Sequence, residues 1–111
     1  MVIHDIASFA VFRPDKMGKA DLVTTSRLFV GINSFEPGQE HASHVHEGQD
    51  KVYLILEGRG HVILGDLVRP VGPGDLVLAQ ADEPHGLRNP GPERLVAAVF
   101  MAPPPAAKKA G

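Results

Sequence analysis

The chain has 111 residues, a formal net charge of -2, 43% hydrophobic and 22% charged residues, and no cysteine. These values predict one soluble globular domain and give no reason to expect a nucleic-acid or anionic-membrane partner. The lack of cysteine excludes disulfides and thiolate metal ligands, and it suits the cytoplasm, which we expect as the location. No apolar run approaches the roughly 20 residues of a membrane span.

Short apolar runs follow one another along the chain, at 6–12, 28–35, 52–56, 61–64, 67–71, 76–79 and 95–101. Turn signals rich in Gly and Pro separate them, and Gly65-Asp66 predicts a two-residue hairpin between two of the runs. A helical turn would fit only within 15–26. This spacing favours an all-β antiparallel sandwich or barrel over 1–102. The Pro/Ala/Lys-rich residues 103–111 predict an extended or disordered tail.

Two histidines, His44 and His46, stand two residues apart just before the run at 52–56. A strand points such residues to one face, so both imidazoles could meet one metal ion. Taken alone, a His-x-His pair is more often a solvated polar edge than a metal site.

The wider spacing around these histidines resembles the two motifs of the cupin superfamily, in the manner of a small single-domain, RmlC-like bacterial cupin of the cupin 2 type. The motif residues span 38–89 at matching intervals; they are Gly38, His44, His46, Gly58, Gly74, His85 and Asn89. The resemblance implies a double-stranded β-helix, or jelly-roll, barrel. It also implies that His44, His46 and His85 converge on a divalent transition metal (Fe, Mn, Zn or Ni), and that the chain is a homodimer whose residues 1–35 pack at the interface.

The sequence departs from the second motif where the family has Pro and Gly, because Gln80 and Asp82 stand there. Glycine at the second of these positions permits a tight turn, so Asp82 must adopt an unusual φ or shift the turn. We interpret this change as a turn variant without functional meaning.

A more consequential departure places Lys51 where the first motif has its glutamate ligand. A protonated lysine has no lone pair to offer a metal. Lys51 must therefore turn outward, lose its proton, or indicate a cupin without metal. Gln49 shares strand parity with Lys51 and is the preferred fourth ligand; Asp50, or water in an open position, is the alternative.

Three more polar side chains stand close to the motif residues in the sequence. Tyr53 has the parity of Lys51, so it is a candidate proton donor, with core packing as the equal alternative. We expect His41 to be solvated and His61 to lie on the surface.

The favoured function is a metal-dependent enzyme acting on a small polar metabolite by isomerase, lyase or dehydratase chemistry. The metal would act as a Lewis acid, and Lys51 or Tyr53 would move the proton. A mononuclear iron dioxygenase is the alternative enzyme. A non-catalytic binding module and a metal-free cupin that uses Lys51 with His44 or His85 also stay open, because a fold alone does not set a reaction.

Overall fold

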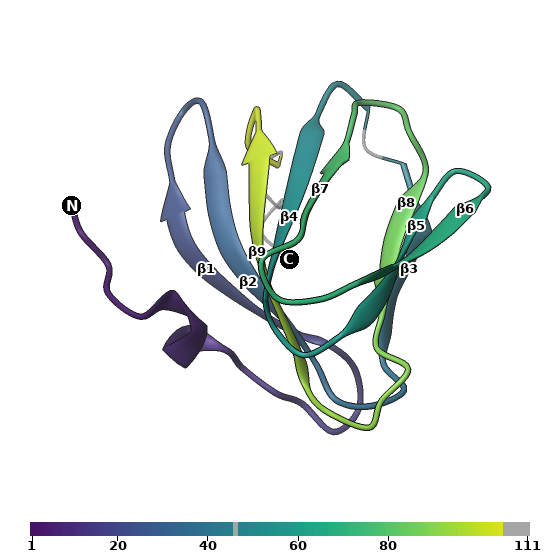
Figure 1. Cartoon of the computed structure of the whole chain (residues 1–111). Helices are drawn as coiled ribbons and strands as arrows, with labels where there is room; N and C mark the ends of the chain where they lie inside the picture. The colour runs from purple at the N-terminus through teal and green to yellow at the C-terminus, as the bar shows by residue number, and fades with distance from the viewer. Residues whose placement is uncertain (46, 106–111) are drawn as a thin grey trace.

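Nine β-strands and one short 3₁₀ helix make up the chain in a computed structural model that describes residues 1–45 and 47–105 (Figure 1). The helix η1 spans Ile6–Phe9, and the strands are β1 Gly18–Thr24, β2 Phe29–Phe35, β3 Glu40–His44, β4 Asp50–Glu57, β5 Gly60–Leu64, β6 Leu67–Val71, β7 Leu76–Ala79, β8 His85–Arg88 and β9 Leu95–Ala102.

The strands form two antiparallel sheets that face each other (Figure 1). One sheet has the strand order β1-β2-β9-β4-β7, and the other has the order β3-β8-β5-β6. Strands that are far apart in the chain are neighbours in both sheets, as in a jelly roll. The all-β jelly-roll prediction is therefore confirmed. The predicted hairpin is also present, because Leu64 pairs with Leu67 across Gly65-Asp66.

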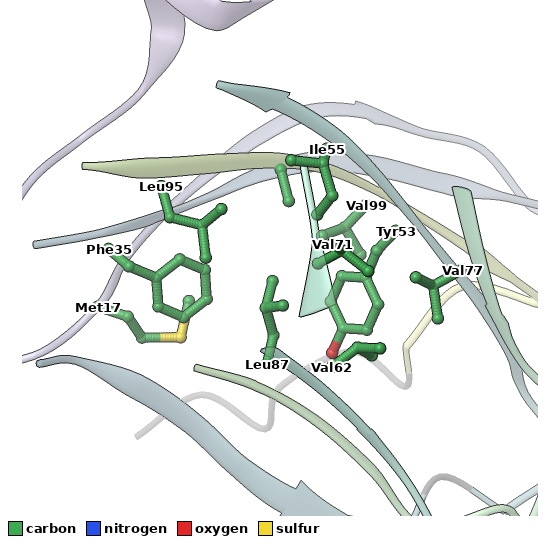
Figure 2. Packing of buried hydrophobic residues seen from close by; sticks show 11 residues of the cluster. Met17, Phe35, Tyr53, Ile55, Val62, Val71, Val77, Leu87, Leu95 and Val99 are labelled. Atoms are coloured by element: carbon green, nitrogen blue, oxygen red, sulfur yellow. The ribbon is translucent and has the colours of Figure 1, made fainter. Parts of the chain in front are cut away.

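The space between the sheets is filled by apolar side chains from both of them (Figure 2). β4 alternates as a half-buried strand should: Lys51, Tyr53 and Ile55 are buried, whereas the residues between them are partly exposed. Phe35 and Leu95 come from the same sheet, and Val62 and Leu87 face them from the other. The core occupies this interior, and polar side chains are also buried at both ends of β8, where His85 and Asn89 lie.

The outer face of the five-stranded sheet carries a second apolar cluster, built on Ile32, Val96 and Ala98. Ile6, Ala10 and Phe12 of the N-terminal segment pack against it. The strand predicted at 6–12 is therefore wrong: this segment begins with a 3₁₀ turn and lies across the sheet instead of joining it (Figure 1). An apolar run of this length fits either arrangement, because both bury the same side chains.

Three strands were not predicted, and each contains polar residues that face the interior. The helical turn considered for 15–26 is wrong, because Gly18–Thr24 forms β1 and pairs with β2. β3 and β8 are absent from the predicted apolar runs because their histidines interrupt the apolar alternation that marks a strand. These three strands carry most of the site described below.

Two turn positions of the motifs, at residues 58 and 82, have positive φ angles that side-chain-bearing residues rarely adopt. Gly58 has a φ of 79°, and a Cβ there would lie 2.0 Å from the carbonyl oxygen of Arg94, so only glycine fits. Asp82 stands where the family has glycine and adopts the left-handed φ of 69°. Of the two options for Asp82, the structure has the unusual φ, which Asp tolerates better than most residues.

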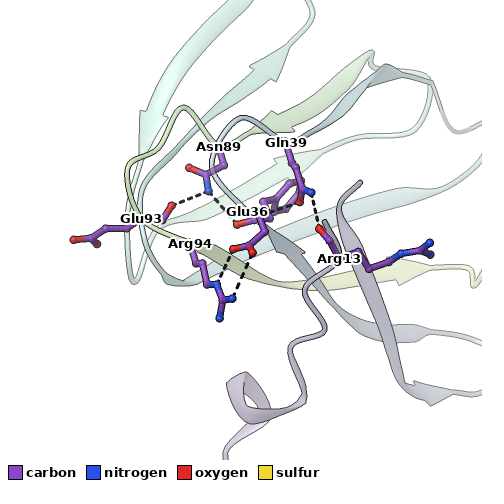
Figure 3. A network of polar contacts seen from close by, with 7 residues as sticks. Arg13, Glu36, Gln39, Asn89, Glu93 and Arg94 are labelled. Carbon is purple, nitrogen blue, oxygen red and sulfur yellow. Dashed lines mark hydrogen bonds and ion pairs between the residues drawn. The ribbon is translucent and has the colours of Figure 1, made fainter. Parts of the chain in front are cut away.

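Asn89, at the end of β8 that lies away from His85, ties the end of β2 to the loop between β8 and β9 (Figure 3). Its buried side chain donates to the carbonyls of Phe35 (3.0 Å) and Glu93 (2.8 Å) and accepts from the amide of Gly91 (2.8 Å). Beside it, Arg94 forms an ion pair with Glu36 at 2.7 Å. This network joins the turn after β2 to the loop between β8 and β9.

Three further expectations concern membrane spans, the C-terminal tail and the homodimer. Among residues 1–45 and 47–105, no helix has the length and apolarity that a membrane span needs. β9 ends at Ala102, and residues 106–111 of the predicted tail lie outside the described residues; the domain boundary at 102 stays a prediction. The homodimer stays a prediction.

Candidate metal and ligand site

The two sequence motifs meet at a pair of histidines. His44, the last residue of β3, lies directly opposite His85, the first residue of β8, in the antiparallel ladder. Their ring centroids are 4.4 Å apart, with the ring planes tilted by 55°. His85 is buried and His44 is half-buried. The structure thus brings together two of the predicted ligands that stand forty-one positions apart in the chain.

Both imidazoles are oriented by the backbone. The Nδ1 atom of His44 lies 2.7 Å from the carbonyl oxygen of Ala42, and that of His85 lies 2.9 Å from the carbonyl oxygen of Glu83. A carbonyl only accepts, so each Nδ1 carries the hydrogen, and the neutral ring then has its lone pair on Nε2. Burial lowers the pKa of both histidines, which favours this neutral form.

His41 belongs to the same cluster, which sequence parity did not foresee. Its ring centroid lies 4.2 Å from that of His44, and His41 is half-buried, so the expectation of a solvated side chain is not what the structure shows. Residues three apart should point to opposite faces of a regular strand. The β3–β8 register shifts between His41 and His44, and this irregularity brings both side chains to the interior face.

Lys51 points inward from β4 and is 1% exposed. Its Nζ lies 4.8 Å from the centroid of the Tyr53 ring, within the range of a cation–π contact. Burial lowers the pKa of Lys51 to about 8, and the positive charge of Lys19 acts in the same direction. Of the options left by the sequence, an outward-turned Lys51 does not occur.

The two candidates for the fourth ligand have other partners. Gln49 is buried, and its amide nitrogen donates to the carbonyl of Pro103 at 3.0 Å. Asp50 is exposed on the opposite face of β4, where its carboxylate accepts from the amide of Ala81 at 2.9 Å. The parity argument for Gln49 over Asp50 therefore agrees with the structure. Metal coordination by Gln49 stays a prediction.

Tyr53 is fully buried in the interior cluster, and its hydroxyl points toward the sheet that carries Val62 (Figure 2). Within the described part of the chain this hydroxyl has no hydrogen-bond partner. Burial raises the pKa of Tyr53 above its ordinary value. Its ring supports Lys51, and its ring centroid lies 6.3 Å from that of His85. This placement fits the packing reading of Tyr53, and its role as a proton donor stays a prediction.

A cavity of about 510 Å³ opens beside these groups. His41, His44 and Lys51 line it, together with residues that belong to neither sequence motif, notably Lys19 and Asp21 of β1 and Asn33 of β2. Lys19 lies opposite Asn33 in the β1–β2 ladder. A prediction of β1 as a strand would have shown that Lys19 and Asp21 share one face.

The donor chemistry of this cluster fits a divalent transition metal. Imidazole nitrogen is a common ligand for such ions, and a backbone carbonyl on the other ring nitrogen is the usual way to orient it. His46, the third predicted ligand, lies outside the described residues. Residues 1–45 and 47–105 contain no complete group of three His, Asp or Glu side chains that could hold a metal.

Comparisons with known proteins agree with the jelly-roll fold. The family model described as "Cupin domain" matches residues 31–101. The oxalate-binding protein of Thermotoga maritima is 29% identical over 75 residues, which cover 68% of this chain and 61% of that protein. The chain thus spans about three fifths of the length of this relative.

Solved structures match over nearly the whole chain. The TT1209 protein of Thermus thermophilus is 37% identical, with a TM-score of 0.88, over 93% of this chain and 98% of that one. A conserved protein of Klebsiella pneumoniae with a double-stranded β-helix domain is 25% identical, with a TM-score of 0.87, over 95% and 92% of the two chains.

Proposed function

Because the chain belongs to the cupin family, we propose that it binds a divalent transition metal through His44, His46 and His85 and acts on a small carboxylate-bearing metabolite. The observation that carries this proposal is the opposed His44–His85 pair, with both rings oriented by backbone carbonyls. When bound, the metal would supply Lewis-acid polarisation of a substrate carbonyl or hydroxyl.

A negatively charged substrate is favoured by the charges along the cavity. Lys19 and Lys51 both line it, and no carboxylate of the described residues lies within ion-pair distance of either. Asp21 is the acidic residue among the lining side chains. The relative in Thermotoga maritima is named for binding oxalate, a small dicarboxylate, which agrees with this substrate class.

Lys51 is the side chain that would move the proton. A neutral amine can accept a proton from a carbon or oxygen acid, and the lowered pKa of Lys51, about 8, keeps part of the population neutral near physiological pH. Proton transfer beside a polarised carbonyl suits isomerase, lyase or dehydratase chemistry. The second candidate is a metal-free cupin, which the buried Lys51 in the acidic ligand's position favours.

Metal content separates the two candidates. Protein purified without a His tag or chelator is expected to contain about one equivalent of a divalent transition metal. His44→Ala and His85→Ala should each weaken metal binding by more than about tenfold. His61→Ala is the matched control, because His61 lies outside the His44–His85 cluster. Its Nδ1 lies 3.5 Å from a guanidinium nitrogen of Arg88.

Less than about 0.1 equivalent of metal, with none restored by titration of Fe, Mn, Zn or Ni, would overturn the metal-dependent proposal. With metal-loaded protein, oxalate is the first ligand to test by its effect on the melting temperature, since a ligand that binds only the folded state stabilises it. The shift should be smaller in Lys51→Met and Lys19→Met than in the unaltered chain.

A further inference from the structure

Lys51 combines deep burial with a rigid backbone and a place in a cavity wall. Its strand, β4, is paired on both sides, so that Lys51 lies opposite Met101 of β9 and Ala79 of β7. The side chain is 1% exposed and still lines the cavity of about 510 Å³. A cavity of this size holds a small metabolite.

The surroundings of Lys51 favour a neutral amine. A buried lysine is usually paired with a carboxylate, because an isolated buried ammonium is costly. In the described part of the chain, Lys51 has no hydrogen bond or ion pair that would hold a proton on its amine, and the positively charged Lys19 lines the same cavity. A neutral, desolvated amine is a nucleophile as well as a base.

Lys19 indicates which carbonyl compounds would fit. Its side chain is exposed at the same cavity that Lys51 lines. A ligand with a carboxylate next to its carbonyl would offer an anion to Lys19 and an electrophilic carbon to Lys51. We propose that Lys51 forms an imine with a small 2-oxo acid, whose carboxylate is bound by Lys19.

The chemistry of this step balances without a redox partner. The Nζ lone pair adds to the carbonyl carbon while the C=O π bond breaks and the oxygen takes a proton, which gives a carbinolamine. The nitrogen then forms a C=N bond as the C–O bond breaks. Both hydrogens of the neutral amine leave with the carbonyl oxygen as water. His44, which lines the same cavity, can relay these protons.

This inference goes beyond the proposed function, because imine formation by Lys51 needs no metal. Its experiment is therefore done twice, on the full-length protein as purified and on the same protein after treatment with EDTA. Each sample is incubated with pyruvate and sodium cyanoborohydride, which reduces an imine to a stable secondary amine. Intact mass and peptide mapping then locate the adduct.

We expect a single adduct on the peptide that contains Lys51, with the mass of pyruvic acid less one water plus two hydrogens. Lys51→Met should lose this adduct while keeping its circular dichroism spectrum. Lys19→Met should slow the labelling of Lys51 by pyruvate about fivefold, in line with the loss of one exposed ion pair. Labelling by acetone, which has no carboxylate, should be equal in Lys19→Met and the unaltered chain.

Labelling of Lys51 no faster than that of the exposed Lys16 would overturn the imine, and so would the absence of any adduct on Lys51. If such protein still contains metal, the proposed metal-dependent function stands while the imine falls. If the adduct forms on Lys51 and no metal can be bound, the imine stands and the metal-dependent function falls. An equal rate for pyruvate in Lys19→Met would refute the role of Lys19.

Discussion

Replacing the buried Lys51 by methionine is expected to remove a pH dependence of stability. Methionine has a similar length and no charge, so Lys51→Met keeps most of the packing against Tyr53. In the unaltered chain, burial lowers the pKa of Lys51 from its ordinary 10.5 to about 8. Between these two values the folded lysine is mostly neutral, whereas the lysine of the unfolded chain is still protonated.

The unfolded state therefore binds more protons in this interval, and the free energy of unfolding rises with pH. Integrated from about pH 7 to about pH 9.5, this difference in pKa amounts to about 2 kcal/mol. Below the folded pKa both states are protonated, so the penalty of the buried charge is present in full. Measurements stay below the ordinary pKa of tyrosine, because the raised pKa of Tyr53 makes stability fall above it.

Urea unfolding of the EDTA-treated protein, followed by circular dichroism at several pH values, measures this rise. The difference in free energy of unfolding between the unaltered chain and Lys51→Met should grow by about 2 kcal/mol over this range. Lys19→Met removes an exposed lysine and should keep most of the rise. If the difference in free energy of unfolding between the two proteins stays constant to within about 0.5 kcal/mol, Lys51 is not a buried amine without an anionic partner.

Two further predictions concern buried polar groups. Asn89→Ala removes three hydrogen bonds at a fully buried position and should lower the free energy of unfolding, measured by urea denaturation, by about 3 kcal/mol. Arg94→Ala breaks an exposed ion pair with Glu36 and should lower it by less than about 1 kcal/mol. Equal losses in the two variants would contradict the role of Asn89 in joining the end of β2 to the loop after β8. Tyr53→Phe removes a buried hydroxyl that has no partner in the described residues and should raise the melting temperature by the equivalent of about 1 kcal/mol. A strongly destabilised Tyr53→Phe would show that this hydroxyl has a partner.

The sequence predicted the fold class and the convergence of the motifs well, because both depend on spacing. Strands such as β4 and β9 alternate or run apolar over their whole length, and the glycines at 38, 58 and 74 adopt positive φ values at the expected turns. Strand parity also predicted that Gln49 and Lys51 share one face and Asp50 lies on the other, and in the structure Gln49 and Lys51 are buried whereas Asp50 is exposed.

The strands that line the site were harder to predict because a binding cavity needs polar groups where a core strand has apolar ones. The residues of β1 lack a clear strand pattern, so the sequence does not indicate that Lys19 and Asp21 line the cavity. His41 was assigned to solvent because a one-residue irregularity in β3 cannot be read from strand parity. The sequence could not show that Tyr53 would lie inside the apolar cluster with Lys51 against its ring.

The position of β3 has a consequence for how the site opens. β3 is the edge strand of its sheet and is paired with β8, whereas β9 lies in the middle of the other sheet between β2 and β4. Edge strands fray at a smaller free energy than the whole protein unfolds. Each fraying of β3 would carry His44 away from His85 while the five-stranded sheet stays intact. A ligand bound to both histidines therefore opposes the fraying of β3. Its dissociation rate and the rate of amide hydrogen exchange in β3 should both depend on this local opening.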